Sequence, residues 1–129
     1  MMPELRPEAS ALVQKVKTFI KDEVMPKEHL FHEQIKVGED RWNSYPEVID
    51  ELKEKARSVG LWNLFLPESE FGAGLSNYEY AHIAEEMGKC HIASEAMNCS
   101  APDTGNMEVI ARYGNEPVSY THLTLPTKA

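Results

Sequence analysis

Apolar residues recur at intervals of three and four along most of this chain, and this spacing limits its fold more than any other feature. Between residues 7 and 24, Leu12, Val16, Phe19 and Ile20 fall on one helical face, with charged residues opposite. The spacing predicts an amphipathic helix. Similar patterns and short helix-forming stretches predict further helices, at 27–34, 44–60, 76–88, 93–98 and 102–114. About five helices without paired strands make an all-α domain.

Two of the predicted helices begin at capping signatures. Ser44 and Glu47 stand three residues apart, and so do Ser76 and Glu79. In a capping box the serine side chain accepts from the backbone N–H of the glutamate, whose carboxylate accepts from the backbone N–H of the serine. Both serines are therefore predicted to cap helices. Gly60 is predicted to end the first of these helices in the left-handed conformation.

The segment between those two helices is apolar at first and turn-rich afterwards. Residues 61–67 read LWNLFLP, which indicates a buried connector, and residues 68–76 read ESEFGAGLS. Glycines let backbone amides approach an anion, but Gly72 and Gly74 lack the lysine and hydroxyl residue that follow them in a phosphate-binding loop. We interpret these glycines as positions of left-handed turn geometry.

Composition argues against two classes of partner. Thirteen Lys and Arg against twenty-one Asp and Glu give a net charge of −8, which repels nucleic-acid phosphates and anionic lipids. No apolar run approaches the ~20 residues of a membrane-spanning helix, and no leader opens the chain. Two cysteines are too few for a disulfide framework. We therefore expect no nucleic-acid partner, no membrane span and a reducing compartment.

Residues that can ligate metals or act as nucleophiles are present, but their spacing does not favour a site. His29 and His32 lie one helical turn apart without an evident third ligand. Cys90, His91 and Cys99 lack a C-x-x-C pair, and nothing identifies an orienting partner for a cysteine nucleophile. The residue chemistry alone indicates a soluble helical domain with no metal site and no self-contained active site.

The last residues of the chain differ from the rest. Residues 118–127 read VSYTHLTLPT, which has no helical period. The same string results from translating DNA that resembles the transposase-end and adapter sequences of sequencing libraries. Such segments are set aside in fold analysis. We interpret residues 1–116 as one native domain and residues 117–129 as a non-native tail; the alternative is a natural threonine-rich C-terminal strand.

Two longer strings resemble the acyl-CoA dehydrogenase family. Residues 60–90, GLWNLFLPESEFGAGLSNYEYAHIAEEMGKC, combine an apolar GLW segment, Pro-Glu, a glycine-rich loop and a helix carrying Ala-Glu-Glu. Residues 98–116, NCSAPDTGNMEVIARYGNE, are similar to the long- and very-long-chain-like branch, whose animal members can be fused to a kinase-like domain. The resemblance covers essentially all of residues 1–116.

The resemblance implies a fold and a reaction. In that family a helical N-terminal domain, a β-sheet middle domain and a C-terminal helical bundle enclose FAD and a fatty acyl thioester. A glutamate removes the α-proton, the β-hydrogen leaves as hydride to the flavin, and a trans-2-enoyl-CoA results. Electron-transferring flavoprotein usually reoxidises the flavin, and the enzymes are dimers or tetramers. This chain corresponds to the N-terminal helical domain, truncated before the β middle domain, so the base and most FAD contacts are expected elsewhere.

The resemblance also implies where substrate lies. The turn leading into the last predicted helix corresponds to a wall of the acyl pocket, and its candidate substrate-binding residues are Met97, Ser100, Pro102, Asp103 and Thr104. No catalytic residue and no cofactor-binding residue is predicted within this chain.

Two other functions are compatible with the sequence. The chain could be a free-standing, non-catalytic helical interaction module, or a fragment of a related flavoenzyme such as an acyl-CoA oxidase, whose electrons pass to oxygen. The family resemblance places the parent enzyme in the cytoplasm of a bacterium, or in a mitochondrion or peroxisome of a eukaryote.

Overall fold

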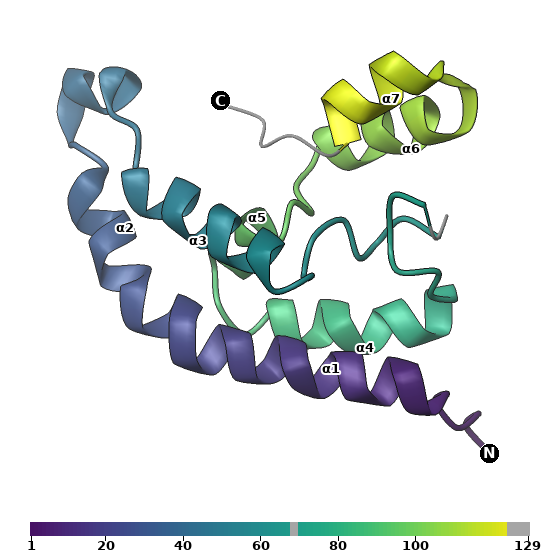
Figure 1. The fold of residues 1–129 in the computed structure, drawn as a ribbon. Helices are drawn as coiled ribbons and strands as arrows, with labels where there is room; N and C mark the ends of the chain where they lie inside the picture. Colours follow the sequence, from purple (N-terminus) through teal and green to yellow (C-terminus); the bar gives the residue numbers. More distant parts are fainter. Residues whose placement is uncertain (68–69, 124–129) are drawn as a thin grey trace.

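The computed structural model describes residues 1–67 and 70–123, and all regular structure in them is helical (Figure 1). The α-helices are α1 Pro7–Phe19, α2 Glu28–Gln34, α3 Glu47–Ser58, α4 Asn77–Met87, α5 Ala93–Ala96, α6 Asp103–Tyr113 and α7 Glu116–Leu123. A π-helical turn, Ile20–Val24, and two 3₁₀ segments, Met25–Lys27 and Gly38–Asn43, complete the set. The all-α prediction is confirmed. No helix in the described ranges is long and apolar enough to cross a membrane.

The helices pack in two groups. In the larger group α1 lies beside α4, and α3 packs against α2 and α5 (Figure 1). These helices enclose the main core, whose fully buried side chains include Leu52, Leu61, Ile83, Ile92 and Met97. In the smaller group α6 and α7 pack on each other and on the connector after α3. Their second core contains Leu66, Met107 and Leu123.

The first helical run changes its hydrogen-bond pattern before Pro26. The backbone N–H of Met25 donates to Ile20, five residues back, so the turn between them is π-helical. Pro26 then lies in the 3₁₀ segment that leads into α2, a position where its missing N–H costs little. The run therefore continues past Pro26 into α2 without an intervening loop.

Ser44 does not cap α3, so that prediction is wrong. The helix begins only at Glu47. The Ser44 hydroxyl instead donates to the carbonyl of Arg41 at 2.9 Å and accepts from the backbone N–H of Lys36 at 3.2 Å, which closes the loop before the helix. The side chain of Gln34 replaces the cap, because its oxygen accepts from the second N–H of α3 at 2.9 Å.

The C-terminus of α3 follows the prediction. Gly60 has φ +77°, in the left-handed region. Its N–H donates to the carbonyl of Arg57 at 3.1 Å, and the N–H of Leu61 donates to that of Ala56 at 2.8 Å. These two bonds form a Schellman motif, which satisfies carbonyls that the helix end would leave unpaired.

The capping box of α4 is confirmed. Glu79 donates its backbone N–H to Ser76 Oγ at 3.2 Å, and its carboxylate accepts from the backbone N–H of Ser76 at 3.0 Å. The same carboxylate accepts two hydrogen bonds from Arg6, whose Nε and Nη2 donate at 2.5 Å and 2.7 Å. One glutamate thus starts α4 and ties the segment before α1 to it.

The two serines give a first testable prediction. Ser76→Ala should lower the free energy of unfolding by about 1 kcal/mol, because it leaves an N-terminal donor of α4 unpaired. Ser44→Ala is the matched control and should cost less than about 0.5 kcal/mol, because water can replace its two hydrogen bonds in the exposed loop before α3. Denaturant titration of both variants measures the two values. Equal losses would contradict the assignment of Ser76 as the cap.

Glu79 gives a second prediction, about pH. Hydrogen bonds from Arg6, and then from the Ser76 backbone, lower the pKa of Glu79 to about 2. The ordinary pKa of a glutamate is about 4.3. The ionised carboxylate therefore stabilises the fold fully above the ordinary pKa, and this contribution disappears as the pH falls toward 2. Glu79→Gln removes the titrating group, so its stability should depend less steeply on pH.

The measurement is the free energy of unfolding of both proteins from pH 7 to pH 2. The difference in free energy of unfolding between the unsubstituted chain and Glu79→Gln should be constant above about pH 5 and should fall toward zero as the pH approaches 2. A gap that stays constant down to pH 2 would contradict the lowered pKa.

The helix α7 includes residues 118–123, although their sequence has no helical period. Tertiary contacts replace amphipathicity there. The hydroxyl of Ser119 donates to the carbonyl of Ile110 at 3.1 Å, and Leu123 is fully buried in the second core. The rest of that segment, 124–127, lies outside the described residues. Its non-native origin stays a prediction.

Candidate functional site

The five predicted substrate-binding residues lie in the turn between α5 and α6 and at the start of α6. Met97 is 1% exposed and belongs to the main core, whereas Pro102 and Asp103 are exposed at the start of α6. Ser100 and Thr104 are half-buried, and the N–H of Thr104 donates to the carbonyl of Ser100 at 3.2 Å. The turn brings the five backbones together, but their side chains divide between the core and the surface. Their role as a pocket wall stays a prediction.

Two buried asparagines hold this turn, and the sequence analysis missed both. Asn98, in the turn, and Asn63, in the connector after α3, have φ values of +60° and +55°. Asparagine tolerates this left-handed region better than most residues. The amide of Asn98 donates to Asn63 Oδ1 at 2.6 Å and lies 3.4 Å from Met107 Sδ, and the amide of Asn63 donates to the Leu123 carbonyl at 2.5 Å. One side-chain ladder thus joins both cores.

A buried cation supports the turn from the other side. The side chain of Lys53, on α3, is 3% exposed, and its Nζ lies 2.6 Å from Glu95 Oε1 on α5. Burial raises the pKa of Glu95, but hydrogen bonds from Lys53 and Ser100 outweigh it, so the net shift is downward. Glu95 is therefore ionised at neutral pH and holds Ser100, one of the predicted pocket residues. The Lys53–Glu95 ion pair therefore fixes the position of α5 and Ser100 relative to α3.

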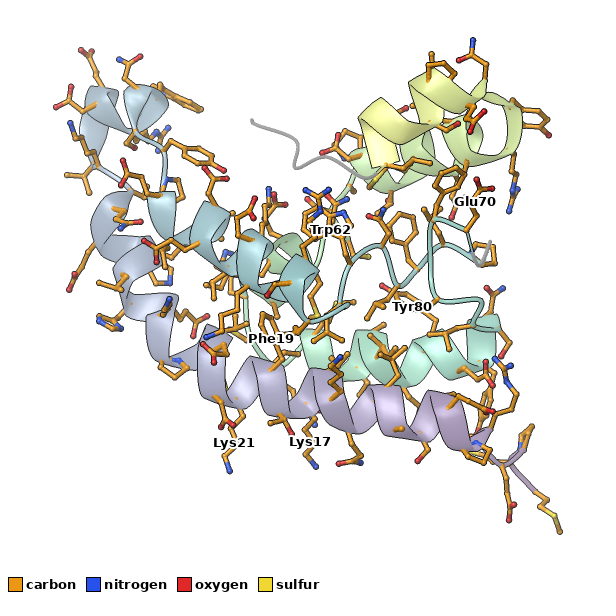
Figure 2. All side chains as sticks on the ribbon, in the orientation of Figure 1. Lys17, Phe19, Lys21, Trp62, Glu70 and Tyr80 are labelled. Atoms are coloured by element: carbon orange, nitrogen blue, oxygen red, sulfur yellow. The ribbon has the colours of Figure 1, made fainter. Side chains whose placement is uncertain are left out.

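A groove with a cavity of about 490 Å³ lies between α4 and the turn. Its walls are formed by Tyr80, Ala84, Met87, Gly88, Cys90, His91, Ser94 and Cys99. Tyr80 comes from α4 (Figure 2), and its hydroxyl lies 2.9 Å from Cys99 Sγ. Burial raises the pKa of Tyr80 and of both cysteines above their ordinary values. The thiols are thus protonated at neutral pH, and the groove suits an uncharged apolar group better than nucleophilic chemistry.

One unpaired polar atom stands out among the described residues. Within 1–67 and 70–123, Trp62 Nε1 is the one buried side-chain nitrogen or oxygen without a hydrogen-bond partner (Figure 2). A flavin ring would need several donors and acceptors aimed at it, so this atom alone does not make a FAD site.

Two of the histidines, His32 and His91, form a stacked pair. The rings of His32 and His91 are nearly parallel, with centroids 6.3 Å apart, and both flank Phe31. Within the part of the chain that the structure describes, no group of three His, Cys, Asp or Glu residues is arranged to hold a metal ion.

Comparisons with known proteins agree on one family. The family model described as acyl-CoA dehydrogenase, N-terminal domain, matches residues 6–124. Acyl-CoA dehydrogenase family member 10 of Mus musculus is 49% identical over 117 residues, which cover 87% of this chain and 11% of that protein. Family member 11 of Homo sapiens is 51% identical over 105 residues, covering 79% and 13%.

The fold agrees as well. A solved structure assigned as an acyl-CoA dehydrogenase from Mycobacterium abscessus superimposes with a TM-score of 0.78 at 44% identity, covering 89% of this chain and 30% of that one. The chain thus spans little more than a tenth of the two curated relatives and under a third of the solved chain.

Proposed function

Because the chain belongs to the acyl-CoA dehydrogenase family, we propose that it is the N-terminal helical domain of an enzyme that desaturates fatty acyl-CoA to trans-2-enoyl-CoA with FAD. The observation that carries this proposal is the match of the family over residues 6–124 together with the shared fold at 44% identity. The chain covers 30% of that solved chain, which supports a division of labour in which other polypeptide supplies the chemistry.

The part of this domain in that reaction is to form one wall of the acyl pocket. The α5–α6 turn is the wall, and two polar supports fix it: the Asn63–Asn98 ladder and the Lys53–Glu95 pair. Apolar contact suffices for such a wall, since each buried methylene is worth about 0.8 kcal/mol. Chain-length preference therefore depends partly on this turn.

The remaining parts of the reaction belong to polypeptide outside this chain. FAD, when bound, accepts the hydride, and the base that removes the α-proton acts beside it. We also propose that the parent enzyme is a homo-oligomer and that electron-transferring flavoprotein is its electron acceptor. Its location would be the cytoplasm in a bacterium, and the mitochondrion or peroxisome in a eukaryote. No step of the chemistry is assigned to a side chain described here.

The direct test is an assay of the full-length parent enzyme. With an artificial electron acceptor, acyl-CoAs of graded chain length should be oxidised, and substitutions at Ser100 or Thr104 should shift the preferred length more than they change the rate on the best substrate. Absence of oxidation at every length would overturn the proposal. Transfer of electrons to oxygen at an undiminished rate would identify an oxidase instead.

A further inference from the structure

A small apolar cavity lies between the end of the first helical run and the C-terminal end of α4, and three lysines are among the residues that line it. It has a volume of about 240 Å³, and its walls are formed by Lys17, Ile20, Lys21, Met25, Glu86 and Lys89. Ile20 forms part of its floor and is 2% exposed, whereas Met25 is 41% exposed beside it. The volume equals the share of about eight water molecules in the liquid, which is room for a short aliphatic chain.

Two of the four charged residues around this cavity form no ion pair with a described residue. Lys17 and Lys21 stand four residues apart and make no ion pair with any residue in 1–67 or 70–123, and Figure 2 shows both extending away from the other helices. Lys89 pairs with Glu86 at 2.8 Å. Like charges at this spacing destabilise a helix slightly. The lining thus carries three positive charges and one negative charge, in a chain whose net charge is −8.

The backbone beneath the cavity is irregular. Ile20 and Lys21 belong to the π-helical turn Ile20–Val24, and Met25 follows it. Single π-helical turns are rare, and they occur frequently at functional sites. Met25 follows Lys21 by four residues, so apolar side chains and lysines line the same cavity.

We propose that this cavity binds an amphipathic carboxylate, with its aliphatic chain on Ile20 and Met25 and its carboxylate between Lys17 and Lys21. The apolar walls exclude a purely ionic ligand, and the lysines select an anion over an alcohol of the same length. The site is separate from the α5–α6 turn and does not depend on the proposed function.

The test uses octanoate as the probe and the full 129-residue chain labelled with ¹³C at its methionine methyl groups. Octanoate should shift the Met25 signal saturably, while the buried Met87, Met97 and Met107 stay unchanged as internal controls. Octanol, which lacks the charge, and acetate, which lacks the chain, should produce no saturable shift at equal concentration.

Variants complete the test. Lys17→Gln/Lys21→Gln should weaken octanoate binding about tenfold or more, the effect of losing one good charge-assisted contact. Lys36→Gln, an exposed lysine elsewhere, should leave binding unchanged. The proposal is overturned if octanol shifts Met25 equally, if all methionine signals move together, or if the double variant binds octanoate as the natural chain does.

Discussion

Glu95→Ala should destabilise the chain by about 2–3 kcal/mol, and Lys53→Met by clearly less, although both break the same ion pair. Removal of Glu95 leaves the Lys53 ammonium buried without a counter-charge, and such a break costs about 3–5 kcal/mol in fully buried pairs. The lower figure applies because the side chain of Glu95 is 40% exposed, so water replaces part of the lost interaction. Lys53→Met removes the buried charge and keeps a side chain of similar shape.

Thermal denaturation measures this difference. The melting temperature of Glu95→Ala should fall by about 10 °C for a chain of this size, and the double variant Lys53→Met/Glu95→Ala should recover much of the loss. The same double variant is the control for an indirect effect of Glu95 on the turn. If Lys53→Met destabilises the chain as much as Glu95→Ala does, Lys53 is not a buried cation that needs Glu95 as its counter-charge.

Gly72→Ala should be at least as destabilising, with a loss of about 3 kcal/mol or more from overpacking against fixed backbone. A Cβ at Gly72 would lie 2.0 Å from the carbonyl oxygen of Leu66 and 2.8 Å from its carbonyl carbon. Leu66 is fully buried in the second core, so the connector has little room to move away. Denaturant titration should show the loss directly.

Gly105→Ala is the matched control for this variant. Gly105 lies inside α6, and a Cβ there would meet nothing within 4 Å. The substitution should stabilise the chain by about 0.5–1 kcal/mol, because alanine favours a helix over glycine. Similar losses for both variants would show that the close contact at Gly72 does not constrain the fold.

Local signals in the sequence predicted most of the fold. The helix that begins with Ser76 and the helix end at Gly60 are both set by groups within one turn, so their patterns are readable. Ser44 has the same spacing to Glu47 as Ser76 has to Glu79, yet it caps nothing. The acceptor for α3 comes from Gln34, which lies outside the spacing that defines a capping box, so no local rule identifies it.

The difference between local signals and long-range contacts also explains why the roles of Gly72 and Lys53 were not predicted. The sequence indicated left-handed turn geometry at Gly72 and Gly74, but only Gly74 has a positive φ, and Gly72 is needed for close approach to Leu66. In the sequence, Lys53 is one of three basic residues in the second half of α3, with Lys55 and Arg57. Its burial depends on Glu95, forty-two residues later, and a long-range partner of this kind has no signature in composition or spacing.

The candidate site was predicted only through resemblance. The turn from Met97 to Thr104 contains no motif that chemistry alone would single out. The signal that the sequence did offer was overlooked: Asn63 interrupts the apolar run LWNLFLP, and a polar residue there indicates a buried hydrogen bond or a left-handed position. The structure shows both at Asn63.

The central claim is that these helices form a wall for chemistry that other polypeptide performs. The most direct measurement is a titration of the isolated 129-residue chain with FAD, followed by flavin fluorescence and by absorbance after gel filtration. We expect no stoichiometric binding and no bleaching of flavin on addition of acyl-CoA. Stoichiometric FAD that is bleached by acyl-CoA would contradict the claim.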